Sequence, residues 1–171
     1  MSCIETQAPL PGYRPCVGIF LLGPARQVFV GQRLDTPEAW QMPQGGIDAG
    51  ESIAAAGLRE LKEEIGTDRA ELLRESAIWR AYDLPPAIAA RKWHGRYRGQ
   101  TQRWLAMRFT GEDADIRLDA HEPEFGVWRW VPADRLVELI VPFKRAIYAS
   151  VVEEFRPLWQ PEAGLKQAEG R

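Results

Sequence analysis

The chain has 171 residues, of which 45% are hydrophobic and 27% charged, and its formal net charge is −2. This composition is typical of one globular domain. No apolar run approaches the ~18 residues that a membrane span needs, and the near-neutral charge gives no general attraction to nucleic acid. We therefore expect no membrane association and no DNA partner. The start of the chain lacks the pattern of a signal peptide, and Cys3 and Cys16 form no Cys-x-x-Cys pair, which predicts a reduced, cytoplasmic protein.

The first half of the chain contains one strong helix pattern. Residues 1–12 carry two prolines and little periodicity, so we expect a flexible arm. Residues 15–22 and 27–34 are predicted strands of a hairpin, and residues 35–49 a loop rich in turn residues. The clearest helix spans residues 52–65, with Ser52 as its N-cap and Gly66 as its end.

The second half alternates between strand and helix patterns. Strand-like segments follow at residues 72–84, 102–111 and 127–131, with a long loop at 85–99. Residues 134–139 predict a short helix and residues 142–155 a full one with Pro142 in its first turn. Residues 157–171 have the composition of a disordered tail. Residues 13–156 therefore indicate a single α/β domain with a mixed β-sheet between helices.

Three glutamates share one side of the helix predicted at residues 52–65. With 3.6 residues per turn, Glu60, Glu63 and Glu64 fall within roughly 100° of arc, away from the apolar face. Arg59 can pair with Glu63, but no cation stands at helical spacing from Glu60. A solvated acidic surface is the ordinary interpretation of such a face. The alternative is a divalent cation site, since Mg²⁺ takes one or two carboxylates plus substrate phosphates and lowers the pKa of a bound water.

The loop before this helix favours the second interpretation. Gly45, Gly46 and Gly50 precede the helix start, where backbone N–H groups and the positive end of the helix dipole favour phosphate. The spacing of Gly45 and Gly50 before Ser52 is that of a P-loop. A P-loop carries lysine before the serine, whereas this chain has Glu51 there, which excludes that motif.

The fixed residues of this segment are spaced as Gly45-x5-Glu51-x7-Arg59-Glu60-Leu61-x-Glu63-Glu64-x-Gly66. This spacing resembles the Nudix box of the Nudix hydrolases at every fixed position except the last, where Thr67 replaces an apolar residue. Further segments over residues 13–155 resemble the bacterial subgroup of RNA pyrophosphohydrolases and diadenosine polyphosphate hydrolases. They include Tyr13-Arg14-Pro15, Trp40-Gln41-Met42-Pro43-Gln44, Tyr82-Asp83-Leu84-Pro85, Gln102-Arg103-Trp104, Pro123-Glu124-Phe125, Trp128-Arg129-Trp130 and Val141-Pro142-Phe143-Lys144-Arg145.

The resemblance implies a Nudix α/β/α sandwich that uses Mg²⁺, or alternatively Mn²⁺, to direct water onto a phosphorus atom. The implied metal ligands are the backbone carbonyl of Gly45 and the carboxylates of Glu60, Glu63, Glu64 and Glu124. The same four glutamates are the implied catalytic residues, and either Glu63 or Glu124 deprotonates the water. The sequence leaves that choice open.

Two of these assignments have their own qualifications. Exposed acids are common, so Glu124 alone would be interpreted as a surface residue. Its loop also departs from the family at Gly126, where relatives often carry an acid. Arg59 and Glu51 are implied to form a structural ion pair that orients the helix.

The resemblance also implies a substrate-binding set of cations, one amide and two aromatic residues. Guanidinium groups bind phosphate oxygens in pairs, and aromatic faces stack bases, although such residues are also ordinary strand cover or core. The set comprises Arg14, Arg33, Gln44, Tyr82, Arg103, Phe143 and Lys144. In addition, residues 91–108 contain six Lys or Arg and no acid, which indicates either a guide for RNA or a second nucleotide, or an exposed, mobile loop.

Several functions are compatible with this pattern. The leading hypothesis is removal of pyrophosphate from the 5′ triphosphate end of RNA, or of phosphate from a diphosphate end. The alternative is asymmetric hydrolysis of diadenosine tetraphosphate and related dinucleoside polyphosphates. A pyrophosphatase for ADP-ribose or sugar nucleotides is a more distant hypothesis, because the Phe143-Lys144-Arg145 and Tyr13-Arg14-Pro15 segments argue against it. A non-catalytic nucleotide- or RNA-binding module is also distant, since the box glutamates are all present. The sequence does not define the oligomeric state.

Overall fold

The structure, a computed structural model, describes residues 2–161. A mixed sheet of nine strands forms its centre. The main path runs β1 (Ile4–Thr6), β7 (Trp79–Asp83), β8 (Gly99–Phe109), β2 (Arg14–Leu22), β3 (Val28–Arg33) and β4 (Trp40–Gln41), while β5 (Gln44–Gly46), β6 (Ala70–Glu75) and β9 (Phe125–Val131) pair with β2, β8 and β3. The pairing of β2 with β8 is parallel and the others are antiparallel.

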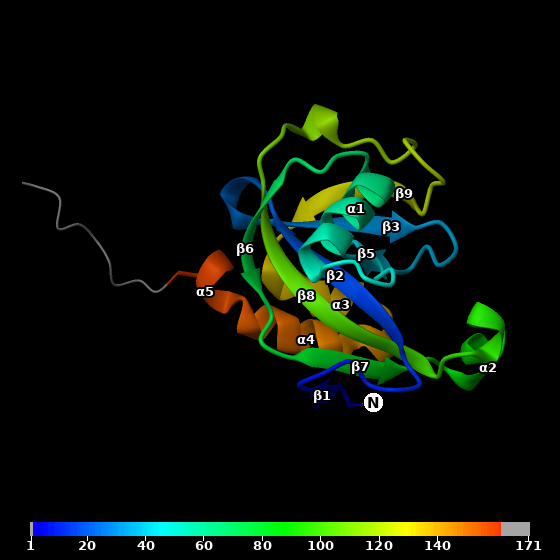
Figure 1. Cartoon of the computed structure of the whole chain (residues 1–171). Helices are drawn as coiled ribbons and strands as arrows, with labels where there is room; N and C mark the ends of the chain where they lie inside the picture. The colour runs from blue at the N-terminus through cyan, green and yellow to red at the C-terminus, as the bar shows by residue number, and fades with distance from the viewer. Residues whose placement is uncertain (1, 162–171) are drawn as a thin grey trace, which may run out of the picture.

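Helices cover both faces of this sheet (Figure 1). On one face lies α1 (Ile53–Ile65), which packs on Val17, Ile19 and Leu105. The other face is covered by α3 (Leu136–Leu139) and α4 (Arg145–Glu154), and α5 (Arg156–Trp159) follows α4. The α/β class with a sheet between helices is thus confirmed. Among residues 2–161, no helix combines the length and apolarity that membrane crossing requires.

The alternating pattern of β2 explains the two cores. Phe20 and Leu22 belong to the core beneath α4, while Val17, Ile19 and Leu21 belong to the core beneath α1, because successive strand residues point to opposite faces. Almost every β2 side chain from Cys16 on is buried, as expected for a strand covered on both faces. The core beneath α4 and the core beneath α1 therefore lie on opposite sides of the sheet.

Several segments expected to be irregular are ordered. The arm expected to be flexible contains β1, which pairs with β7 through Ile4–Ala81. The loop expected at residues 35–49 contains β4 and β5, and the one at 85–99 contains α2 (Pro86–Ala89) and a 3₁₀ turn, Lys92–Gly95. Elements this short carry too few residues for a periodic pattern, and the strands β1, β4 and β5 exist because neighbouring strands supply their hydrogen bonds.

Other predicted elements are divided differently from our expectation. The strand pattern at residues 72–84 forms β6 and β7, separated at Ser76, whose hydroxyl donates to the Ile78 carbonyl. The helix expected at 142–155 begins as a 3₁₀ turn, Pro142–Lys144, before α4. A 3₁₀ turn also precedes α3 at Ala133–Arg135, and others lie at Pro24–Arg26 and Asp113–Asp115. Of the expected tail at 157–171, residues 162–171 lie outside the described part, and α5 ends at Trp159.

Candidate active site

Both ends of α1 are fixed by local chemistry. The Ser52 hydroxyl accepts a hydrogen bond from the Ala55 N–H at 3.1 Å, which satisfies one free donor of the first turn. The helix ends at Gly66, whose φ of 79° is the left-handed conformation that glycine adopts most easily. The predicted cap and end residue are both confirmed. They hold the glutamate face of α1 against β5.

Two of the three α1 glutamates are buried. Glu64 is 4% exposed and Glu60 9%. The Gln44 N–H donates to Glu64 Oε2 at 3.1 Å, and a Cβ added to Gly45 would lie 2.0 Å from the Glu60 carboxyl carbon. Only glycine therefore lets β5 approach the helix this closely. Glu63, the third member, has a half-exposed side chain.

Burial and mutual repulsion disturb the titration of this pair. Burial raises the pKa of Glu64 well above its ordinary value, and the charges of Glu124 and Glu60 raise it further. Burial also raises the pKa of Glu60, where the neighbouring charges of Glu63 and Glu124 act in the same direction against the lowering effect of Arg59. The four implied glutamate ligands are thus close enough for their charges to repel one another. A divalent cation among them would relieve this repulsion.

Arg59 neutralises more of this face than its sequence spacing indicates. Its guanidinium donates to Glu51 at 2.8 Å, to the Gly46 carbonyl at 2.8 Å and to Glu60 at 2.8 Å. It also lies 3.4 Å from Glu63. The expectation that Glu60 has no relieving cation is therefore wrong, because a long side chain can turn back to its immediate neighbour. The expected ion pair with Glu51 is present, and it lowers the pKa of Glu51 to about 2.

Glu124 comes to the acidic helix from the loop before β9. Its backbone carbonyl accepts from the Leu34 N–H, and its half-exposed carboxylate lies 3.7 Å from the Arg33 guanidinium. Its charge raises the pKa of both Glu60 and Glu64. The fold therefore brings this acid, distant in sequence, to the side of the α1 face.

These residues fit a divalent cation by donor chemistry. Glu64 Oε1 is buried and has no hydrogen-bond partner among the described residues, so it retains a free oxygen atom that can bind a cation. Within residues 2–161, however, no three carboxylate, thiol or imidazole groups converge closely enough to hold an ion as they stand. Arg59 occupies Glu60 and Glu63 instead.

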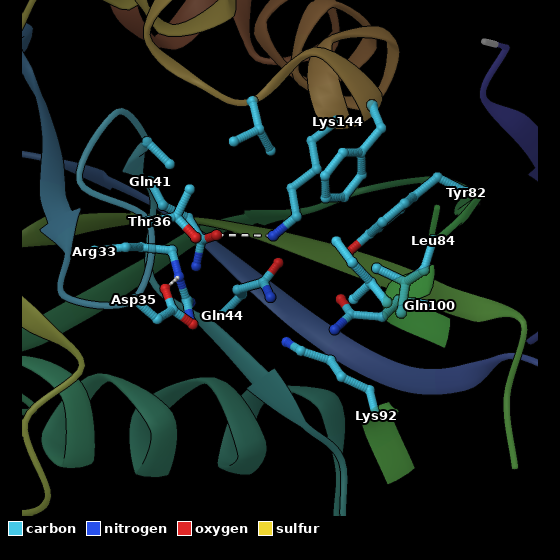
Figure 2. A pocket seen from close by; sticks show the side chains of 14 residues that line it. Arg33, Asp35, Thr36, Gln41, Gln44, Tyr82, Leu84, Lys92, Gln100 and Lys144 are labelled. Carbon is cyan, nitrogen blue, oxygen red and sulfur yellow. Dashed lines mark hydrogen bonds and ion pairs between the residues drawn. The ribbon is translucent and has the colours of Figure 1, made fainter. Parts of the chain in front are cut away.

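A cavity of about 230 Å³ opens beyond β5 (Figure 2). Gln44 connects it to the acidic helix, because its side chain enters the cavity while its backbone N–H binds Glu64. Five members of the expected substrate-binding set line this cavity together: Arg33, Gln44, Tyr82, Phe143 and Lys144.

The walls of the cavity are cationic and aromatic. Lys144 Nζ donates to Gln41 Oε1 at 2.8 Å, and burial, helped by Arg33 and Lys92, lowers the pKa of Lys144 to about 7. The rings of Tyr82 and Phe143 lie 6.0 Å apart. Phe143 is half-buried, whereas Tyr82 is 3% exposed with a hydroxyl that has no partner in the described chain.

Two expected substrate residues lie outside the cavity. Arg14 lies beside Gly46, where an added Cβ would come 2.4 Å from Arg14 Nη2, and its guanidinium lies 5.2 Å from the centre of the Trp93 ring. Arg103 points to the other sheet face, where its Nε lies 3.0 Å from Glu75 Oε1. Arg14 therefore borders the site, and the structure does not bring Arg103 to it.

The cavity also contains polar residues that the sequence patterns did not predict as part of the site. Gln41 and Gln100 line it from β4 and β8, and Lys92 lines it from the segment after α2. The alternation Gln100-x-Gln102 on one strand was an available signal, since it places two amides on one face. Lys92 belongs to the basic stretch at residues 91–108.

A sheet between helices, with a carboxylate-rich helix beside a cationic cavity, is an arrangement that suits the hydrolysis of phosphorylated substrates. The chain belongs to the Nudix family, since the NUDIX domain model matches residues 12–151, and it is a Nudix hydrolase. An RNA pyrophosphohydrolase of Rhodospirillum rubrum is 57% identical, over 91% of this chain and 93% of its own length. Another RNA pyrophosphohydrolase, from Novosphingobium aromaticivorans, is 54% identical over 88% and 96%.

Solved structures share the fold at lower identity. The E. coli dihydroneopterin triphosphate pyrophosphohydrolase superposes with a TM-score of 0.63 at 22% identity, over 84% of this chain and 96% of its own. A C. elegans Ap4A hydrolase gives a TM-score of 0.55 at 19% identity, over 84% and 94%. Nudix hydrolases generally use divalent metal ions.

Proposed function

We propose that this protein removes pyrophosphate from 5′-triphosphate RNA ends, and phosphate from 5′-diphosphate ends, with Mg²⁺ as its metal ion. The observation that carries the proposal is the junction at Gln44, which joins an acidic helix face to a cationic and aromatic cavity. The polyphosphate would lie along the glutamates and the terminal nucleotides in the cavity. Relatives named RNA pyrophosphohydrolase, at more than 50% identity over most of both chains, support this substrate.

Glu60, Glu63, Glu64, Glu124 and the Gly45 carbonyl would hold the metal. Bound there, Mg²⁺ supplies polarisation of a phosphoryl oxygen and a lowered pKa of a bound water. Glu60 and Glu64 are buried beside β5 and suit permanent ligation. Glu63 and Glu124 are half-exposed, so either can accept a proton from a water that approaches the phosphorus.

The cavity provides the substrate contacts. Arg33 and Lys144 supply positive charge for the phosphate chain, and Lys92 adds a third cation at the rim. Phe143 is half-buried and can stack a base. The buried Tyr82 packs against Phe143, with the two ring centres 6.0 Å apart. Arg14, at the border of the site, can reach a phosphate beyond the cavity.

The basic segment beyond α2 favours RNA over a dinucleoside polyphosphate. Arg96 and Arg91 are exposed and make no ion pair with an acid within residues 2–161, and Trp93 and Tyr97 lie edge to face between the cations. Such interleaved cations and aromatic rings are typical of surfaces that bind single-stranded nucleic acid. The free thiols of Cys3 and Cys16 accord with a reducing, cytoplasmic compartment.

The test is a direct comparison of two substrates. The purified protein would be incubated with Mg²⁺ and either 5′-triphosphate RNA or diadenosine tetraphosphate, and the products separated by chromatography. We expect pyrophosphate and 5′-monophosphate RNA from the first, at the higher kcat/KM. Efficient turnover of the dinucleotide alone would assign the alternative substrate. Binding of both without turnover would instead identify a non-catalytic module.

A further inference from the structure

A chain of buried side-chain hydrogen bonds runs beneath the cavity. Trp104 Nε1 donates to Gln102 Oε1 at 3.0 Å. Gln102 Nε2 donates in turn to Gln44 Oε1 and to Gln100 Oε1, each at 2.8 Å. Trp104 is fully buried and Gln102 is 1% exposed. Gln102 itself does not line the cavity, whereas Gln44 and Gln100 both do (Figure 2).

The donor-to-acceptor direction of this series of hydrogen bonds is determined by Trp104. An indole N–H can only donate, so the oxygen of the Gln102 amide must face Trp104 and the NH₂ group must face away. Both NH₂ hydrogens are then used by Gln44 and Gln100, which must present their own oxygens to Gln102. Reversal of any amide would place two donors or two acceptors opposite each other inside the protein, which is unfavourable.

The consequence reaches the cavity surface. Because Gln44 and Gln100 turn their oxygens inward, each presents its NH₂ group to the cavity, where neither makes a hydrogen bond with another residue of the described chain. Gln41 is held separately, since its oxygen accepts from Lys144 Nζ and its Nε2 is buried and unpaired among residues 2–161.

The fold makes this chain possible through one glycine. A Cβ added to Gly18 would lie 2.5 Å from Trp104 Cε2, so the indole lies directly over Gly18 of β2. Gln44 of β5 and Gln102 of β8 flank the same strand, opposite Gly18 and Cys16 respectively. With β2 between them, the two amides lean towards each other on the face shared with the cavity.

We infer that Gln102 is a positioning residue that never touches substrate. Because Trp104 can only donate, Gln102 fixes the orientation of the Gln44 and Gln100 amides, with their oxygens towards Gln102. The cavity floor therefore offers their NH₂ groups as hydrogen-bond donors to acceptor atoms of the bound substrate. This inference rests on the proposed function for the identity of that substrate, a 5′-triphosphate RNA. A residue with only a structural role would affect stability without acting through its two neighbouring amides.

The test is a double-mutant cycle on binding. All proteins would carry Glu63→Gln to keep the RNA intact, and binding of a 3′-labelled, short 5′-triphosphate RNA would be measured by fluorescence anisotropy. We expect Gln102→Met to weaken the Kd about tenfold (about 1.4 kcal/mol). In a Gln44→Ala/Gln100→Ala background the same change should alter the Kd less than about twofold, since the residues it acts through are gone.

Controls separate this effect from loss of stability. Ser76→Ala removes another buried hydrogen bond, in which the backbone N–H of Trp104 donates to the Ser76 hydroxyl. This variant should leave the Kd unchanged. If Gln102→Met does not fold, Gln102→Glu keeps the acceptor for Trp104 and reverses both amides, and it should likewise act more weakly without Gln44 and Gln100. Equal effects of the Gln102 change in both backgrounds, or no binding by the parent protein, would overturn the inference. Binding of RNA that the wild type does not cleave would refute only the proposed function.

Discussion

Glu60, Glu63 and Glu64 share one helix face but occupy different environments. Glu60 and Glu64 are buried and interact with β5, whereas the Glu63 carboxylate has Arg59 as its one hydrogen-bond partner within residues 2–161, at 3.4 Å or more. A change at Glu63 therefore removes a charge from the site with little effect on packing. This makes it the most informative single position for the proposed chemistry.

We expect Glu63→Gln to lower kcat by about 10²–10⁴-fold, the range for loss of a general base, while the free energy of unfolding changes by less than about 0.5 kcal/mol. The amide keeps the shape of the side chain but is neither an anionic ligand nor a base. Initial rates on 5′-triphosphate RNA and urea unfolding would measure the two quantities. Glu71→Gln, at an exposed glutamate of β6, is the matched control. Wild-type rates in Glu63→Gln would remove the proposed role.

Lys144 gives a prediction for pH. Burial lowers its pKa from 10.5 to about 7 in the folded protein. Below pH 7 Lys144 is protonated in both the folded and the unfolded state, so the folded state is destabilised by the full cost of burying the charge. Between about pH 7 and 10.5 only the unfolded state holds it, so this group favours folding increasingly as pH rises, by up to about 1.4 kcal/mol per pH unit.

Substitution of Lys144 by Met should remove this contribution. Urea unfolding would be measured at pH 7.0–8.5. The unfolding free energy of Lys144→Met minus that of the wild type should fall as pH rises, by on the order of 1 kcal/mol per pH unit. Lys62→Met, at an exposed lysine of α1, should show a constant difference. A constant difference for Lys144→Met as well would mean that the buried amine does not titrate in this range.

At the scale of the element, α1 depends on two left-handed glycines with different surroundings. Gly50, before the helix, has φ +78° and open space where a Cβ would be. Gly66, at its end, has φ +79°, but a Cβ there would lie 2.5 Å from the Arg117 carbonyl oxygen. The two positions share the backbone cost and differ in the steric one.

We expect Gly50→Ala to destabilise the protein by about 1–2 kcal/mol, the cost of the left-handed conformation for a residue with a Cβ. Gly66→Ala should cost more, because the backbone of residue 117 must also move. Urea unfolding of both variants at one pH measures the difference. Equal losses would show that the segment around Arg117 yields freely at the end of α1.

The sequence predicted elements whose signals are local. The cap at Ser52, the end at Gly66 and the glutamate face of α1 all follow from residues close together in the chain. By contrast, β5 has only three residues and exists because Gly45 and Gly46 lie against β2. The cavity floor depends on the parallel pairing of β2 with β8, and no local pattern specifies which distant strand becomes the neighbour of β2.

Arg59 shows the same limitation within the site. Helical spacing identified Glu63 as a partner, whereas the contacts to Glu60 and to the Gly46 carbonyl depend on the path of the loop before the helix. Arg103 was selected with the substrate residues, but alternation along β8 turns it to the opposite face from Gln102. Residue type therefore indicated which residues could bind phosphate. The face to which each side chain points is known only once the strands are paired in the sheet.

At the scale of the whole molecule, the segment after α2 extends the site beyond its cavity. Figure 1 shows α2 projecting from the body of the protein, at the end of β7 and β8. Lys92 lines the cavity and Arg96 lies exposed four residues further on. An RNA held by its 5′ end in the cavity would pass this segment with its next phosphates.

We expect a Lys92→Ala/Arg96→Ala variant to lose activity according to RNA length. For a 5′-triphosphate RNA of about ten nucleotides, within the range contacted by single-strand binding surfaces, kcat/KM should fall several-fold, and the slope of its logarithm against log salt should decrease by about 1.4 for two lost phosphate contacts. A triphosphate dinucleotide ends before Arg96 and should lose less. Arg26→Ala/Arg74→Ala, which removes two exposed cations outside this segment, controls for net charge. If both RNA lengths lose activity equally, these cations serve the terminal phosphates alone and the segment does not guide the strand.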